Sequence, residues 1–352
     1  MLNRNRVFVA ATPPVVKKVS VFRIDVVLQK SFHHGVERAK YILCVGLTPA
    51  WQETMEFDRL QLGEVNRCRA ITFSAAGKGA NVARVLNTLG ASTVLLTFCG
   101  GENGKLWLDD LKEAGVRTDV IRTHSAMRVC QTLIDQSTGD ITELVREALL
   151  PTQAEWASFF RRFESRLCRA KLVVIAGALM PGAKDTVYRD LVRLTRSRGV
   201  PVLIDSQKTA LIRTLPHRPL LAKLNVHELE NTLGRSLRSE KQIVAGARRF
   251  IERGARQVVV THGADGAWLV LPERAWHFRP PRIRAVNAIG SGDAVTAGIV
   301  RGIVKGLDIV EAVRLGIACG AANALTLTPG DVDVQAVRKL ARKVVTRVLK
   351  TA

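Results

Sequence analysis

Short apolar runs and amphipathic segments alternate along most of the chain. From residue 41 onward, the runs YILCVGL, STVLLTFCG, KLVVIAG and VPVLIDS have the length and apolar character of buried β-strands. The segments GANVARVLNTLG, GKLWLDDLKEAG and TVYRDLVRLTRSRG place apolar residues at helical spacing and end in glycine. Strands that alternate with helices of this length predict a parallel or mixed sheet with helices on both faces.

The segment RVCQTLIDQSTGDITELVRE departs from this pattern, because its apolar and polar residues nearly alternate around a Ser-Thr-Gly-Asp turn. It predicts a β-hairpin, which we assign to a small β lid built from residues near 48–72 and 120–147. Further strands are predicted at LAKLN, RQVVVTHG and GAWLVL, a helix at SEKQIVAGARRFIERG, a strand-like segment at IRAV, and helices at about 294–305 and 309–325. The basic stretch VRKLARKVVTRVLK predicts an amphipathic surface helix.

The first 40 residues follow neither pattern. They contain eight Lys or Arg residues and two acidic residues, without a convincing succession of strands and helices. We interpret residues 1–40 as a basic N-terminal extension, for which disorder is one interpretation. Residues 41–352 then form one folded domain that includes the lid.

Composition narrows the classes of function. A hydrophobic content of 47% and a charged content of 24% are ordinary for a globular protein. No apolar run approaches the roughly 18–20 residues of a membrane span, and the six cysteines form no C-x-x-C pair, so we expect a cytoplasmic protein with reduced thiols and no membrane partner. The net charge of +22 suggests nucleic acid. Because the charge is spread and no nucleic-acid-binding motif accompanies it, we expect no specific nucleic acid, and anionic substrates explain the basic surface.

A glycine loop late in the chain carries an unusual carboxylate. In NAIGSGDAV, Gly290, Ser291 and Gly292 are followed at once by Asp293 and then by a predicted helix. Such a loop presents unpaired N–H groups at the positive end of the helix dipole, which is a site for anions such as phosphate. The aspartate could take a proton from a hydroxyl that attacks the phosphate, or it could be an ordinary N-cap beside a turn.

A second glycine loop lies near the start of the predicted domain. AAGKGANVARVLNTLG places Gly77, Lys78 and Gly79 before a helix, with Asn81 in its first turn. The spacing is not that of a P-loop or a dinucleotide fingerprint. A lysine between glycines could bind a phosphate or a sugar hydroxyl, and a surface loop is the alternative.

A third motif stands at a predicted strand end. KLNVHELENTLG brings Lys223, Asn225 and Glu228 together around a turn. A carboxylate and an amide at a strand end suit magnesium, directly or through water. An ordinary helix start is the alternative.

In their order, these three motifs resemble the ribokinase/PfkB family of carbohydrate kinases over about residues 41–345, and CGGENG, IAGALMPG, VTHGADGA and AANAL add lesser matches. The resemblance implies an α/β fold, a ribokinase-like three-layer sandwich with a small β-sheet lid, and phosphate transfer from ATP with Mg²⁺. It implies that Asp293 is the general base, that residues 290–292 stabilise the transferred phosphoryl group and that Glu228 organises magnesium through water. The implied ATP contacts are Lys223, Asn225, Thr261, Gly263, Gly266 and Asn323.

The segments ILCVGLTPAWQETMEF, MRVCQTLID and TELVRE resemble the hexose-phosphate kinases of this family, which act on fructose 1-phosphate, tagatose 6-phosphate or fructose 6-phosphate. The resemblance implies that Lys78 and Arg128 contact the phosphate already on the sugar, and an arginine with a lysine suits a phosphate dianion. It also implies a homodimer through the lid. The other implied substrate contacts are Gln52, Gly77, Asn81 and Glu147.

Two departures leave the choice of sugar open. Gln52 stands where the family opening has an aspartate, and Ala76 stands where the glycine loop has its first glycine. The sugar phosphate, the hydroxyl that reacts and any effector therefore stay open. The alternatives are a kinase of the same fold for an unphosphorylated sugar or nucleoside, a non-catalytic basic nucleic-acid-binding protein, and a dehydrogenase, which the missing G-x-G-x-x-G after the first strand disfavours.

Overall fold

A ten-stranded sheet forms the centre of the molecule, which the computed structural model describes for residues 41–349; the expected N-terminal extension lies outside these residues. The strand order is β14-β13-β12-β11-β10-β9-β8-β1-β4-β5. The strands from β11 to β5 pair in parallel, and β12, β13 and β14 add antiparallel pairs at one edge. Their bounds are β1 Tyr41–Gly46, β4 Thr93–Cys99, β5 Thr118–Arg122, β8 Ala170–Ala176, β9 Val202–Asp205, β10 Leu221–Asn225, β11 Val258–Thr261, β12 Ala267–Val270, β13 Ala275–Arg279 and β14 Val345–Leu349.

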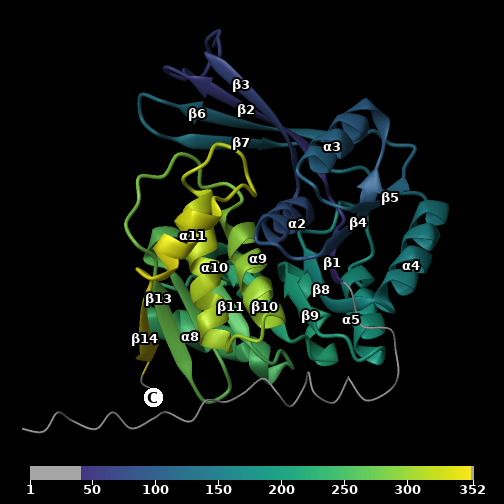
Figure 1. The fold of residues 1–352 in the computed structure, drawn as a ribbon, viewed down its shortest axis with the longest axis vertical. Coiled ribbons are helices and arrows are strands. Elements are labelled where there is room, and N and C mark those ends of the chain that lie inside the picture. Colours follow the sequence, from purple (N-terminus) through teal and green to yellow (C-terminus); the bar gives the residue numbers. More distant parts are fainter. Residues whose placement is uncertain (1–40, 350–352) are drawn as a thin grey trace, which may run out of the picture.

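Helices cover both faces of this sheet, as the sequence predicts (Figure 1). One core packs under α2 (Lys78–Thr88), α3 (Gly101–Glu113), α9 (Ser291–Val304), α10 (Ile309–Asn323) and α11 (Val334–Ala341). The other packs under α4 (Gln153–Leu167), α5 (Val187–Ser197), the short α6 (Lys208–Ile212), α7 (Val226–Leu233) and α8 (Glu240–Glu252). No helix within residues 41–349 has the length and apolar character to cross a membrane. The fold is therefore the expected three-layer α/β sandwich.

A second sheet of four strands stands above the N-terminal end of α2 (Figure 1). Its order is β3-β2-β6-β7, with bounds β2 Ala50–Phe57, β3 Ala70–Ala76, β6 Arg128–Asp135 and β7 Ile141–Val145. We call this sheet the lid. β6 and β7 are the predicted hairpin, whereas β5 pairs with β4 in the large sheet, so the second lid segment begins at Arg128.

Two local predictions are wrong. The basic C-terminal stretch is a helix only to Ala341, and residues 345–349 form β14 on the open edge of β13. Three β-branched residues in VTRVL favour a strand, and β13 offers them unpaired backbone groups. The segment IRAV is not a strand: the N–H of Val286 bonds to the carbonyl of Ala324 at the end of α10.

The six cysteines form no disulfide, and they differ in exposure. All six are free, and four are buried, but Cys68 and Cys168 are exposed.

Glycines fix the start of α2 against the large sheet. Gly77 has a φ of 109° and turns the chain from β3 into α2. A Cβ atom on Gly79 would lie 2.6 Å from the Cα of Gly46 on β1, so the two backbones touch in a way that only glycine allows. The first turn of α2, which carries Lys78 and Asn81, is therefore held rigidly at the end of β1.

Candidate active site

The glycine loop of residues 290–292 forms the N-terminus of α9 at the carboxyl edge of the sheet. Gly290 is the N-cap and has a φ of 79°, in the left-handed region that glycine favours. Asp293 therefore lies in the first turn of the helix and is not its N-cap. Its side chain is buried, although a first helical turn has N–H groups without helical partners.

Asn323, the last residue of α10, holds this loop in place. Its amide nitrogen donates to the carbonyl of Ile289 at 2.9 Å and to Oγ of Ser291 at 3.2 Å, and its amide oxygen accepts from the N–H of Gly330 at 2.7 Å. Its side chain is fully buried. Through these contacts Asn323 supports the glycine loop. The contact with ATP that the sequence suggested for Asn323 stays a prediction.

The second glycine loop meets the first through a hydrogen bond. Nδ2 of Asn81 donates to Oδ2 of Asp293 at 2.7 Å. Burial and the nearby carboxylate of Asp205 raise the pKa of Asp293 to about 6, although Lys78, Lys223 and the bond from Asn81 act to lower it. Oδ1 of Asn81 is buried without a partner among the described residues, which leaves an acceptor for a ligand hydroxyl next to the carboxylate.

Asp205, at the end of β9, is a central residue that the sequence motifs did not reveal. Its carboxylate is fully buried and accepts from Nζ of Lys223 at 3.0 Å and from Oγ1 of Thr296 on α9 at 2.7 Å. Burial alone would raise the pKa of Asp205, but Lys223 and Lys78, with these hydrogen bonds, hold it at about 2. An aspartate directly after the apolar run VLI was the available signal, because a charge there stands at the sheet edge where ligands bind.

Lys78, at the start of α2, forms ion pairs with residues of β9 and α7. Its Nζ lies 2.8 Å from Oε1 of Glu228 and 3.4 Å from Oδ1 of Asp205. Burial opposes a charge on this lysine, yet the surrounding carboxylates raise its pKa above the ordinary value. Glu228 also forms a capping box with Asn225, accepting from its N–H at 2.8 Å while the Asn225 side chain accepts from the Glu228 N–H.

The residues expected to contact ATP lie on neighbouring strand ends. Asn225 ends β10, Thr261 ends β11, and the two are paired across the sheet. Gly263 and Gly266 flank a tight turn after β11, and Gly266 has a φ of 101°. Lys223 lies beside the glycine loop, since a Cβ atom on Gly292 would lie 3.0 Å from its Nζ.

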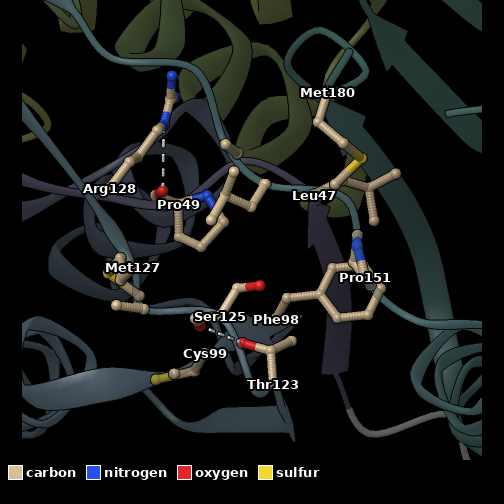
Figure 2. A pocket seen from close by; sticks show the side chains of 14 residues that line it. Leu47, Pro49, Phe98, Cys99, Thr123, Ser125, Met127, Arg128, Pro151 and Met180 are labelled. Carbon is tan, nitrogen blue, oxygen red and sulfur yellow. Dashed lines mark hydrogen bonds between the residues drawn. The ribbon is translucent and has the colours of Figure 1, made fainter. Parts of the chain in front are cut away.

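The residues expected to contact the sugar surround the base of the lid. Gln52 is buried on β2 and donates to Oγ1 of Thr132 at 2.9 Å, whereas Glu147 is exposed after β7. Arg128 borders a shallow pocket with mainly apolar walls (Figure 2). The residues labelled there include Leu47, Pro49, Phe98, Met127, Pro151 and Met180.

The charged groups of Lys78 and Arg128 have different partners in this structure. The Arg128 guanidinium donates to three backbone carbonyls, those of Thr48 at 2.8 Å, Arg146 at 3.0 Å and Pro49 at 3.3 Å. The Lys78 ammonium bonds to carboxylates on β9 and α7. The shared phosphate site suggested by the sequence is therefore not preformed as one cluster.

Comparisons with known proteins identify a family and several relatives. The family profile described as pfkB family carbohydrate kinase matches residues 39–332. A 1-phosphofructokinase of Bacillus subtilis is 30% identical, with 81% of this chain and 93% of the relative covered, and an ATP-dependent 6-phosphofructokinase isozyme 2 of Mycobacterium tuberculosis is 31% identical, with 82% and 85% covered. The solved structure of a Thermotoga maritima protein described as a possible 1-phosphofructokinase superposes with a TM-score of 0.81 at 25% identity, covering 88% of this chain and all of that one.

Proposed function

The chain belongs to the pfkB family of carbohydrate kinases, and from this membership we propose that it transfers the γ-phosphoryl group of ATP to a hydroxyl of a hexose phosphate, giving a bisphosphate. The observation that carries the proposal is the buried Asp293, which receives a hydrogen bond from Asn81 at the N-terminus of α9. A carboxylate with a raised pKa beside an anion site is what deprotonation of an attacking hydroxyl requires.

The reaction follows from this arrangement. Asp293 takes the proton of the acceptor hydroxyl as its oxygen attacks the γ-phosphorus, and the bond to the β-phosphate oxygen breaks to release ADP. The N–H groups of residues 290–293 and the ammonium of Lys223 stabilise the negative charge on the transferred group. The unpaired Oδ1 of Asn81 would accept a second sugar hydroxyl and orient the acceptor. Closure of the lid would exclude water from the site during the transfer.

Magnesium fits two carboxylates of this site. Asp205 and Glu228 both face one cation, the ammonium of Lys78, and carboxylate oxygens are the ligands that Mg²⁺ prefers. Within residues 41–349, no three His, Cys, Asp or Glu side chains are grouped to hold a metal. ATP phosphates and water would therefore supply the other ligands, and the bound ion would neutralise phosphate charge.

Arg128 is our candidate for binding the phosphate already on the sugar. Its three carbonyl partners are neutral acceptors. A phosphate dianion is a stronger acceptor and matches the planar guanidinium in two hydrogen bonds. Exchange of carbonyls for phosphate would free the link between β1 and β2 and the end of β7, so sugar binding and lid movement would be coupled.

Release of ADP with Mg-ATP tests the function. We expect turnover with fructose 1-phosphate, fructose 6-phosphate or tagatose 6-phosphate and little with fructose, ribose or adenosine, because only the phosphorylated sugars engage Arg128. Arg128→Lys should raise KM for the sugar phosphate about tenfold or more, since a lysine cannot form the bidentate contact. Turnover only on an unphosphorylated acceptor would leave the fold and Asp293 in place and remove the proposed role of Arg128.

The lid offers an apolar face for a second copy of this chain. Phe73 and Leu144 lie on the same face of the lid and are about half exposed, and the ring of Trp51 stacks with that of Phe73 at 6.1 Å. The opposite face carries the buried Gln52 and Thr132. We propose that two lids pair through the apolar face, since exposed apolar surface of this kind marks protein interfaces.

Light scattering on the purified protein tests the dimer. We expect a dimer for the unmodified chain and a monomer for Phe73→Lys, which puts a charge on the apolar face opposite Glu53 of the paired strand. Leu62→Lys is the matched control, because Leu62 is exposed in the loop between β2 and β3 and should leave the mass unchanged. A monomeric unmodified protein at micromolar concentration would contradict the proposal.

A further inference from the structure

Two lysines, Lys78 and Lys223, face the carboxylates of the site, and their side chains differ in solvent exposure. The side chain of Lys223 is 3% exposed and is held between Asp205 and the glycine loop. The side chain of Lys78 is 34% exposed, and its ammonium spans Glu228 and Asp205. Lys78 can therefore leave its partners by rotating its side chain, whereas Lys223 cannot leave without uncovering a buried charge.

The ion pair of Lys78 with Glu228 also joins two halves of the site. Lys78 follows directly from lid strand β3 through Gly77, and its backbone is fixed because Gly79 touches Gly46. Glu228 is fixed on α7 by its capping box with Asn225. The partners are thus held by separate elements, and the partly exposed lysine side chain spans the space between them.

We propose that Lys78 is an internal competitor for the divalent cation: in the ligand-free protein its ammonium occupies the position between Glu228 and Asp205 that Mg²⁺ takes with ATP, and metal binding displaces it. This inference rests on the proposed kinase function. One of the two Glu228 oxygens already accepts from the Asn225 N–H, so the oxygen that faces Lys78 is the one open to a metal. The displaced ammonium then becomes available to the phosphate groups of the substrates.

Competition of this kind weakens metal binding to the free protein. The apparent affinity for metal is the intrinsic affinity multiplied by the fraction of molecules in which the carboxylates are free of Lys78. If that fraction is about one-tenth, metal binds roughly tenfold more weakly. ATP adds phosphate ligands that compensate for the loss. The protein would thus bind the metal–nucleotide complex while it discriminates against the bare ion.

Binding of Mn²⁺ to the nucleotide-free full chain, followed by the electron spin resonance of free Mn²⁺, tests the inference without turnover. Lys78→Met should lower the Kd roughly tenfold. Lys78→Arg should stay near the unmodified value because it keeps the cation, and Lys105→Met, at an exposed pair with Glu102, should not change it. An unchanged Kd for a folded Lys78→Met protein overturns the competition, whether or not the kinase reaction is found.

A second measurement needs no variant. The extent of amine acylation at Lys78, quantified by mass spectrometry on the unmodified protein, should rise severalfold when Mn²⁺ is added, because the displaced ammonium leaves its carboxylate partners. Acylation of Lys105 is the internal reference. A constant or reduced labelling of Lys78 at saturating Mn²⁺ would show that the lysine stays in place and would overturn the inference.

Discussion

Replacement of Asp293 by asparagine should lower kcat on the sugar phosphate by about 10³-fold, within the range that a general base contributes. The amide keeps the size of the side chain and can still accept the hydrogen bond from Asn81. What is lost is the ability to take a proton from the acceptor hydroxyl. KM should change little, because neither substrate loses a binding contact. Steady-state ADP release with Mg-ATP is the measurement.

The stability of Asp293→Asn separates chemistry from folding. The pKa of Asp293 is raised to about 6, so at neutral pH the buried carboxylate is ionised at a cost that the neutral amide does not carry. The free energy of unfolding should therefore be no lower than that of the unmodified protein. Asp308→Ala, which removes the N-cap side chain of α10, is the control and should keep full kcat while losing about 1 kcal/mol of stability.

The same carboxylate should set the acid limb of the activity profile. Since the base works only when deprotonated, kcat/KM should fall about tenfold per pH unit below pH 6. Asn81→Leu removes a hydrogen bond that lowers this pKa, so its acid limb should shift to higher pH. A flat profile down to pH 5, or an Asp293→Asn variant with more than one-tenth of the normal kcat, would contradict the role of Asp293 as base.

The large elements of the fold were predictable because their signals are local. Buried parallel strands are continuous apolar runs, and helices show their period within three turns. The split at Ala341 was not predictable in the same way, because the strand at residues 345–349 depends on the open edge of β13, about 70 residues earlier. The capping box of Thr152 and Glu155 at the start of α4 is an equally local signal, although no helix was predicted there.

The candidate site was predictable as residue types and less so as contacts. Glycine loops before helices are recognisable in a sequence, so Asp293 and Asn81 could be named as candidates. Their hydrogen bond could not be predicted, because it joins positions 212 residues apart. Side-chain direction was the larger difficulty. Nothing in AAGKGAN says that Lys78 extends toward Glu228 and Asp205, because that direction is set by charges on β9 and α7.

Replacement of Asp205 by asparagine should lower the free energy of unfolding by about 3–5 kcal/mol, the usual cost of removing one partner from a buried ion pair. Lys223 would keep its charge at 3% exposure without the carboxylate that pairs with it, and Thr296 would lose a charged acceptor. Urea unfolding at pH 7 measures the change. Asp58→Asn, which breaks the exposed pair with Arg69, is the matched control and should cost less than about 1 kcal/mol.

The pH dependence of unfolding gives this loss a second signature. The pKa of Asp205 in the folded protein, about 2, lies below its ordinary value of 3.8, so its stabilisation is complete above about pH 4 and declines as the pH falls toward 2. The shift corresponds to about 2 kcal/mol, and Asp205→Asn should lack that part of the acid destabilisation. Adding Lys223→Met to Asp205→Asn should recover part of the stability, because the uncompensated cation is then gone. If Asp205→Asn unfolds at the same urea concentration as the unmodified protein, the buried ion pair does not hold the base of the site together.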